Sequence, residues 1–399
     1  MKRSLDIRGL LWGVVLLSVS TCIWLPCMHV FFKRDMSRYR VESGLSPVAS
    51  QLSAAYLAIW DDPTLRENEF AKMRKRNPEW DFMSRTYLVL SLANMGLRDP
   101  ESRDRLVEII DAIIADTLAR EKEEGHVHFL LGYGRGGGWV VDPPRSVFVD
   151  GEIALMMAAR RFLGENEAYK TAMAERVEFM IPRMQKSPVL CAESYPDECW
   201  LFCNTVALAA VRMGDVLDGS DHTEFLDAWV RTAKAKLLES TTGILISAFG
   251  VDGSPAPSAF SPEGSSIWMA AHMLEIVDPA FAKDQYKRAR IELGSTFLGF
   301  GYSREWPCGL EGFVDIDSGP IVPVLGASAS ASGLAVLGAA AFDDVAYFGE
   351  LMMSLECGGF PTKARGQLRY QASNAVGDAV LLYAMTEGPL WDAVNRGMQ

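Results

Sequence analysis

The apolar residues of this chain recur with a helical period over most of its length, and this pattern limits the fold more than any other feature. Apolar side chains repeat at i, i+3, i+4 and i+7, as in amphipathic helices. No strand-rich region intervenes, and short apolar runs such as Ile244–Phe249 are expected as hairpins. The pattern predicts helices at Ser46–Trp60, Phe82–Met95, Glu101–Arg120, Val147–Leu163, Glu167–Met184, Trp200–Leu217, His222–Ser240, Ser265–Val277, Pro279–Phe300, Gly319–Ala341, Asp343–Cys357, Ala372–Met385 and Pro389–Arg396.

The predicted helices alternate in character. Glu101–Arg120 and Pro279–Phe300, for example, are charged on one face, whereas Val147–Leu163 and Ala372–Met385 are rich in small residues and nearly free of Lys. Charged amphipathic helices suit an outer layer, and small-residue helices suit a closely packed inner layer. We therefore predict an all-α fold, an (α/α)6 toroid, formed by residues 41–399 as one domain.

An apolar segment near the N-terminus predicts a membrane anchor. Leu10 to Phe32 contains no charged residue and exceeds the roughly 20 residues that a spanning helix needs. A cleaved signal would have a shorter apolar region and a small-residue cleavage site. We therefore interpret residues 1–40 as a single transmembrane anchor. Lys and Arg flank both sides of the segment, so its orientation stays open.

Charge separates this segment from the rest of the chain. The first 40 residues hold seven Lys or Arg and two acidic residues, so the net charge of −12 leaves −17 for the remainder. Such an acidic domain disfavours binding to nucleic acid. A hydrophobic fraction of 49% is that of a globular chain with a large core.

Carboxylates are concentrated where the chain enters the predicted inner helices. Three pairs occur there: Asp150 with Glu152, Asp197 with Glu198, and Asp315 with Asp317. In a toroid these segments surround one mouth of a central cavity, where converging carboxylates serve as general acids and bases. Helix capping is the alternative explanation for each single acid. We predict that these six face the cavity, with Glu152, Asp197 and Asp317 as catalytic groups, and that the substrate contacts Trp80, Asp81, Phe148, Glu263 and Asp315.

Cysteine and aromatic residues are densest between Cys191 and Asn204. Cys199 and Cys203 lie four residues apart, on one helix face, and we expect Tyr195 and Trp200 beside them to contact the substrate, together with Cys199. A thiol there serves as an acid or nucleophile, or simply packs the core. The His residues form no ligand-spaced set with these cysteines, so we predict neither a metal nor a cofactor.

At Cys203-Asn204 the chain resembles a known family, linalool dehydratase-isomerase. The matching stretches lie between Asp142 and Phe300, and they are Asp142-Pro143, Gly151 to Met156, Pro196-Asp197, Cys203 to Ala207, Trp268, and Asp278 to Phe281. The resemblance implies an (α/α)6 toroid, a periplasmic location and a cofactor-independent enzyme that interconverts geraniol, linalool and myrcene.

The family's catalytic residues carry over in part. Cys203 falls on one of two active-site cysteines, and Ser194 falls on the other, with Cys191 and Cys199 close by. Glu152, which follows Gly151, occupies the position of the family's active-site His. For an Asp and Tyr pair the resemblance offers only Asp61, Asp62 and Tyr87. The resemblance thus implies a site richer in carboxylates than that of the family.

Three functions remain open. The first is a lyase or isomerase of the hydro-lyase type that acts on an alcohol, such as an isoprenoid, by acid–base chemistry. The second is a carbohydrate-active enzyme, since (α/α)6 toroids also host glycoside hydrolases, lyases and epimerases. The third is a non-catalytic membrane-anchored binding protein. The expected partners are a small lipophilic molecule and the membrane, and the sequence leaves the oligomeric state open.

Overall fold

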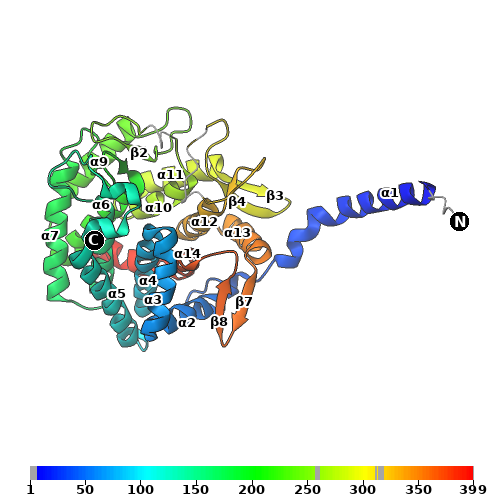
Figure 1. The fold of residues 1–399 in the computed structure, drawn as a ribbon, viewed down its shortest axis with the longest axis horizontal. Coiled ribbons are helices and arrows are strands. Elements are labelled where there is room, and N and C mark those ends of the chain that lie inside the picture. Colours follow the sequence, from blue (N-terminus) through cyan, green and yellow to red (C-terminus); the bar gives the residue numbers. More distant parts are fainter. Residues whose placement is uncertain (1–6, 257–260, 311, 313–318, 399) are drawn as a thin grey trace.

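The computed structural model describes residues 7–256, 261–310, 312 and 319–398. Six helices form a closed inner ring, in which each packs on the next and the last returns to the first. They are α4 (Pro78–Arg98), α6 (Val147–Arg161), α8 (Leu201–Asp218), α10 (Gly264–Leu274), α12 (Ala329–Ala341) and α14 (Ala375–Thr386). A second set of helices lies outside this ring (Figure 1), so the all-α (α/α)6 toroid is confirmed.

The outer helices follow the predicted alternation. They are α2 (Pro47–Asp61), α5 (Arg103–Glu124), α7 (Glu167–Met184), α9 (Thr223–Lys236), α11 (Pro279–Glu292) and α13 (Val345–Gly358). The small residues of the inner ring permit close approach. At Gly151 of α6, for example, a Cβ would lie 3.2 Å from the Cα of Ala207 on α8. One further helix, α15 (Pro389–Gly397), packs on α4 and α8.

Two predicted helices are too long, because short strands replace part of each. Gly294–Phe297 (β3) pairs with Phe300–Arg304 (β4), so α11 ends at Glu292. Ile321–Val322 (β5) pairs with Ala327–Ser328 (β6), and α12 begins only at Ala329. Pro320 and Pro323 lack the backbone N–H that a helix interior requires. Two further pairs complete the strands: Cys199–Trp200 (β1) with Ala248–Phe249 (β2), and Pro361–Ala364 (β7) with Gln367–Tyr370 (β8).

One α-helix of the described residues, α3 (Pro63–Arg76), was not predicted from the sequence. It buries only Phe70 and Met73, so it has almost no apolar period. Its start is nevertheless well defined, because the Asp62 carboxylate accepts hydrogen bonds from the backbone N–H groups of Thr64 and Leu65.

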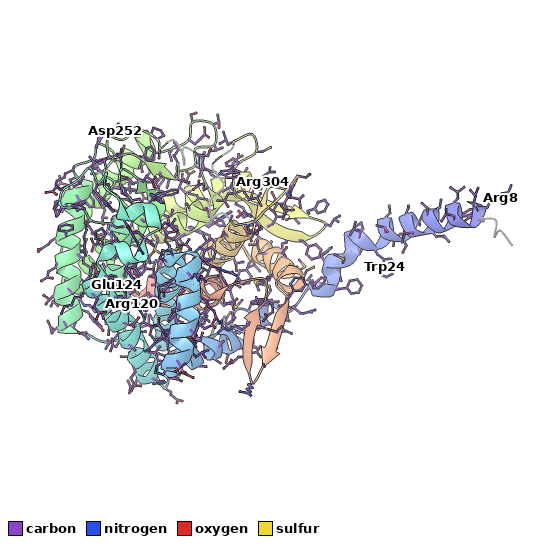
Figure 2. The ribbon with its side chains drawn as sticks, viewed as in Figure 1. Arg8, Trp24, Arg120, Glu124, Asp252 and Arg304 are labelled. Atoms are coloured by element: carbon purple, nitrogen blue, oxygen red, sulfur yellow. The ribbon has the colours of Figure 1, made fainter. Side chains whose placement is uncertain are left out.

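The N-terminal segment projects from the toroid (Figure 1). It consists of α1 (Ile7–Trp24), followed by the 3₁₀ helix η1 (Leu25–Phe32). Together they are long and apolar enough to cross a membrane. The helix type changes at Pro26, where a proline removes an α-helical hydrogen bond. Side chains of α1 such as Trp24 are exposed, and the helix lies off the body of the protein (Figure 2).

Candidate functional site

A cavity of about 750 Å³ lies among the N-terminal halves of the inner helices. Its volume falls in the range of small-molecule sites, roughly 300–1,000 Å³. All six inner helices contribute to its lining, and most of the lining side chains are apolar or aromatic. Representative residues, one from each helix in chain order, are Tyr87, Phe148, Cys203, Ser266, Leu334 and Val380.

Three polar side chains meet where α4, α6 and α8 pack together. Tyr87 and Cys203 line the cavity, and both interact with the carboxyl group of Glu152. Glu152 is 2% exposed, and its Oε2 has no hydrogen-bond partner within the described residues. The hydroxyl of Tyr87 is likewise buried and unpartnered in this part of the chain. Such groups normally find partners, so this cluster is available to bind a ligand.

Burial keeps all three groups protonated at neutral pH or close to it. It raises the pKa of Glu152 to about 7, against a weaker opposing effect of the Thr86 hydroxyl. It also raises the pKa of Tyr87 well above 10, and the negative charges of Glu152 and Cys203 raise it further. For Cys203, burial raises the thiol pKa more than the neighbouring Ser194 hydroxyl lowers it. At neutral pH Tyr87 and Cys203 are therefore hydrogen-bond donors, and Glu152 is a donor in its protonated fraction.

A second polar group lies closer to the mouth. The buried hydroxyl of Tyr195 donates to the carboxylate of Glu79, and it accepts from the Leu131 N–H at 2.8 Å. The Tyr133 ring stacks on Tyr195 with centroids 4.6 Å apart. The Tyr133 hydroxyl donates to Glu198 Oε2 at 3.0 Å. Glu79 thus stays an acceptor inside the cavity, held in place by a neutral phenol.

The structure brings together several residues that the sequence singled out. Seven of them line the cavity, namely Trp80, Phe148, Tyr195, Glu198, Trp200, Cys203 and Glu263. Ser194 is fully buried beside Cys203, and Glu152 lies beside Tyr87 and Cys203. These positions are compatible with the predicted roles.

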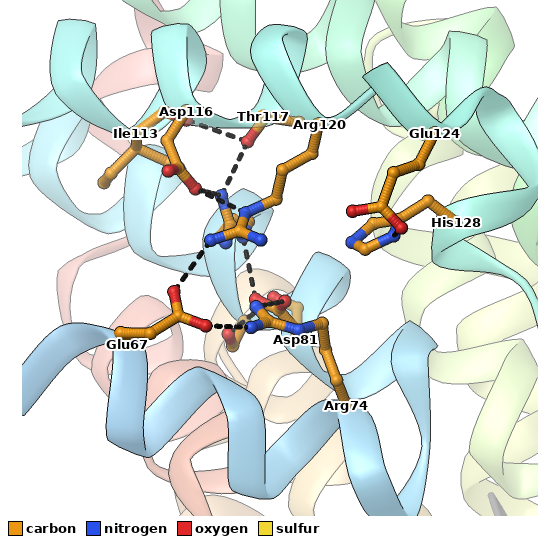
Figure 3. A network of polar contacts seen from close by, with 11 residues as sticks. Glu67, Arg74, Asp81, Ile113, Asp116, Thr117, Arg120, Glu124 and His128 are labelled. Atoms are coloured by element: carbon orange, nitrogen blue, oxygen red, sulfur yellow. Dashed lines mark hydrogen bonds and ion pairs between the residues drawn. The ribbon is translucent and has the colours of Figure 1, made fainter. Parts of the chain in front are cut away.

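Asp81 lies elsewhere, in a charged network between α3, α4 and α5 (Figure 3). Its two oxygens bind Arg74 and Arg85, both at 2.8 Å, and Arg85 also binds Asp116 at 2.6 Å. Asp81 therefore holds three helices together, and we remove it from the proposed substrate contacts.

Other predicted residues also point away from the cavity. Asp150 binds Arg145 and Arg176. Asp197 has a φ of 56° and accepts a hydrogen bond from the Val251 N–H at 3.0 Å, so it fixes a loop. Cys199 is buried, with its thiol 3.7 Å from the Cys191 carbonyl oxygen. The prediction that six carboxylates face one mouth is therefore wrong for Asp150 and Asp197. Asp315 and Asp317 lie outside the described residues.

The sequence pattern missed Glu79 as a cavity residue. Its signal was present, since Asn77-Pro78-Glu79 is a helix start, and Asn77 accepts from the Glu79 N–H at 2.8 Å. Tyr87 was only a loose candidate, but it lies in the cavity. By contrast, Asp61 binds Arg105 and Asp62 caps α3. In the described part of the chain, no three His, Cys, Asp or Glu side chains form a group that could hold a metal ion.

Comparison with known proteins agrees with the resemblance noted in the sequence. Residues 150–300 match the family model described as linalool dehydratase/isomerase, which confirms the resemblance over that segment. This segment includes Glu152, Ser194 and Cys203.

Two solved structures are also similar. One is a GH76 alpha-mannanase from Bacteroides thetaiotaomicron, at 12% identity and a TM-score of 0.45, covering 79% of this chain and 87% of that one. The other is a possible member of the GH105 family from Salmonella enterica, at 12% identity and a TM-score of 0.49, covering 79% and 83%. At these values neither structure bears on the activity of this chain.

Proposed function

We propose that this protein is a cofactor-independent lyase or isomerase that dehydrates or isomerises an alcohol, such as an isoprenoid alcohol, inside the cavity. One observation carries the proposal: Glu152, a buried carboxyl group that has no cationic partner among the described residues, lies with Tyr87 and Cys203 beside a mostly apolar cavity. The match to the linalool dehydratase/isomerase family supports the same class of reaction.

Glu152 is the proposed general acid. A hydroxyl group leaves carbon only slowly unless it is protonated, and a group with a pKa of about 7 gives up its proton readily at neutral pH. Protonated Glu152 would donate to the departing oxygen, which leaves as water. Tyr87 and the Cys203 thiol, both protonated, would orient that oxygen by donating hydrogen bonds, with Ser194 positioning the thiol.

Glu79 is the proposed general base. For dehydration, the second proton must come from the carbon next to the one that loses oxygen. Glu79 is an acceptor in the cavity and acts on Cys203 electrostatically. It takes the role that the sequence analysis gave to Asp197. The rings of Trp80 and Phe148 line the same space and would stabilise positive charge on the substrate carbon.

A carbohydrate-active enzyme is the second candidate. The observation that favours it is the mouth of the cavity, where Trp80, Trp200 and Tyr133 lie with the carboxylates of Glu198 and Glu263. Aromatic rings and carboxylates together also suit sugar chemistry. The apolar lining around Cys203 favours the alcohol. A non-catalytic binding protein would have no catalytic use for the cluster of Tyr87, Glu152 and Cys203.

The test is to incubate the full-length protein with prenyl alcohols and, separately, with oligosaccharides, and to analyse the products by mass spectrometry. We expect loss or migration of the alcohol's hydroxyl group, and we expect Glu152→Gln to abolish it. Asp378→Asn is the matched control, because Asp378 is also buried with a pKa raised to about 7, but it acts on Tyr56 and Tyr370 rather than on Tyr87 and Cys203.

Each result has a separate meaning. Cleavage of oligosaccharides alone would favour the second candidate. Alcohol turnover that survives Glu152→Gln would remove the proposed acid but keep the reaction class. No turnover of either substrate class would favour a binding protein.

A further inference from the structure

The turn between β3 and β4 is apolar where such turns are normally polar. Phe297 pairs with Phe300, so the turn consists of Leu298 and Gly299. Both have positive φ, 51° and 83°. Two-residue turns of this kind favour Asn-Gly or Asp-Gly, because few other residues adopt a left-handed backbone easily. A turn that faces only water gains little from a partly exposed leucine such as Leu298, so its sequence, Phe-Leu-Gly-Phe, points to an apolar environment.

This apolar turn, Phe297–Phe300, contacts the end of the membrane-spanning segment. The ring of Phe300 lies 6.2 Å from that of His29 and 6.0 Å from that of Phe32, between centroids. At Gly299 the backbone is so close to His29 that a Cβ would clash with the imidazole. The turn therefore reaches the depth of the last residues of the span, Leu25–Phe32.

The exposed surface beside the contact is also apolar. Phe297 is 51% exposed, and Val30 and Phe31 of η1 are 59% and 62% exposed. Lys33 and Arg34 follow directly after the apolar segment, as in proteins whose basic residues meet lipid headgroups. The apolar turn and η1 thus form one continuous apolar surface that ends at basic residues.

We infer that the apolar turn is a second membrane contact, inserted into the lipid bilayer beside the end of the span. Continuity with a segment long enough to cross the bilayer favours lipid over another protein as its occupant. Two contacts with the bilayer would fix the orientation of the toroid more firmly than the span does alone.

This orientation places one cavity wall next to the membrane. The helix α13 packs on η1, and its residues Leu351, Ser354 and Leu355 line the cavity. This helix then lies between the cavity and the surface where the span ends. The inference about the membrane contact holds whether or not the proposed reaction is correct.

The test uses the full-length protein in lipid nanodiscs, with a photoreactive benzoylphenylalanine at position 297 or, as a matched control, at position 252. Asp252 is exposed and lies on the side of the toroid far from α1 (Figure 2). Because both proteins carry the same probe, only its surroundings differ. After illumination, we expect several-fold more lipid adduct from position 297 than from position 252.

Equal lipid adducts at the two positions would overturn the inference. Adducts to a second protein chain at position 297 would also overturn it, in favour of a protein partner. A second variant, Leu298→Asn, carries the probe at 297 and a residue that suits the turn's backbone. We expect it to fold normally and to lose most of the lipid adduct, and an unchanged lipid adduct would count against the role of Leu298.

Discussion

Two buried carboxyl groups in neighbouring inner helices, Asp81 of α4 and Glu152 of α6, show two ways to remove a charge from water. Asp81 is 0% exposed and Glu152 is 2% exposed. Asp81 lies between two arginines, at 2.8 Å from each, and its charge is neutralised by its partners. Within the described residues no cation acts on Glu152, and burial raises its pKa to about 7. A paired carboxylate fixes the structure, whereas an unpaired one can exchange a proton.

The largest effect is expected where the paired carboxylate is lost. Asp81→Asn leaves Arg85 buried with a charge that only Asp116 balances. Removing one partner of a buried ion pair costs about 3–5 kcal/mol, so the free energy of unfolding should fall by that amount. Denaturant titration measures it, with exposed Asp104→Asn as a control. A loss no larger than that of the control would show that Asp81 is not structural.

The next largest effect is the pH dependence of stability that Glu152 causes. The pKa of Glu152 is about 7 in the folded protein, against an ordinary value of 4.5, so between these values the folded state binds more protons than the unfolded state. The free energy of unfolding therefore falls as pH rises through this window, by up to about 3 kcal/mol. Glu152→Gln should remove the part of the fall that is due to Glu152 and leave the part that is due to Asp378, whose pKa is also raised to about 7.

Unfolding of the wild type and of Glu152→Gln at pH 5 and pH 8 checks this prediction. Asp81→Asn serves as the opposite case, because it should be destabilising at both pH values. If Glu152→Gln kept the full pH dependence of the wild type, the buried carboxyl group would not be the one that titrates.

A smaller effect is expected on turnover. If Glu152 donates a proton, kcat/KM should fall about tenfold for each pH unit above about 7, equivalent to about 1.4 kcal/mol per unit. A pH profile with the alcohol identified in the product screen measures this fall. Asp378→Asn should keep the same profile, because Asp378 acts on Tyr56 and Tyr370 rather than on Tyr87 and Cys203. A flat profile from pH 6 to pH 9 would exclude Glu152 as the acid.

The comparison also shows what a sequence can reveal about such a site. Helical periodicity predicted the inner ring, because burial of one helix face depends on spacing along the chain. It did not separate Asp81 from Glu152, since both are acids near the start of an inner helix. Their difference depends on Arg74 and Arg85, whose geometry is set by the packing of α3 on α4. The charged helix α3 was itself not predicted.

Glu79 illustrates the same limit. Its position at the start of α4 is typical of a capping region. It becomes a fixed hydrogen-bond acceptor in the cavity because Tyr195, from a distant segment, donates a hydrogen bond to it. The resemblance to a family identified Cys203 and Ser194 as neighbours, which spacing alone could not do. Contacts between distant segments are therefore the part of the site that could not be predicted from the pattern of residues.

The smallest effect on stability is expected in the outer, exposed part of the Asp81 network. This part also tests whether burial explains the contrast between Asp81 and Glu152. Glu67 binds Arg74 at 2.6 Å and Arg120 at 2.9 Å, but its side chain is 58% exposed (Figure 3). Water and salt screen such a pair, so Glu67→Gln should lower the free energy of unfolding by less than about 1 kcal/mol. Denaturant titration beside Asp81→Asn measures the difference. Because Arg74 keeps Asp81 and Arg120 keeps Asp116, neither cation is left alone. A loss as large as that of Asp81→Asn would mean that the network acts as one unit, and burial of the carboxylate would no longer explain the contrast with Glu152.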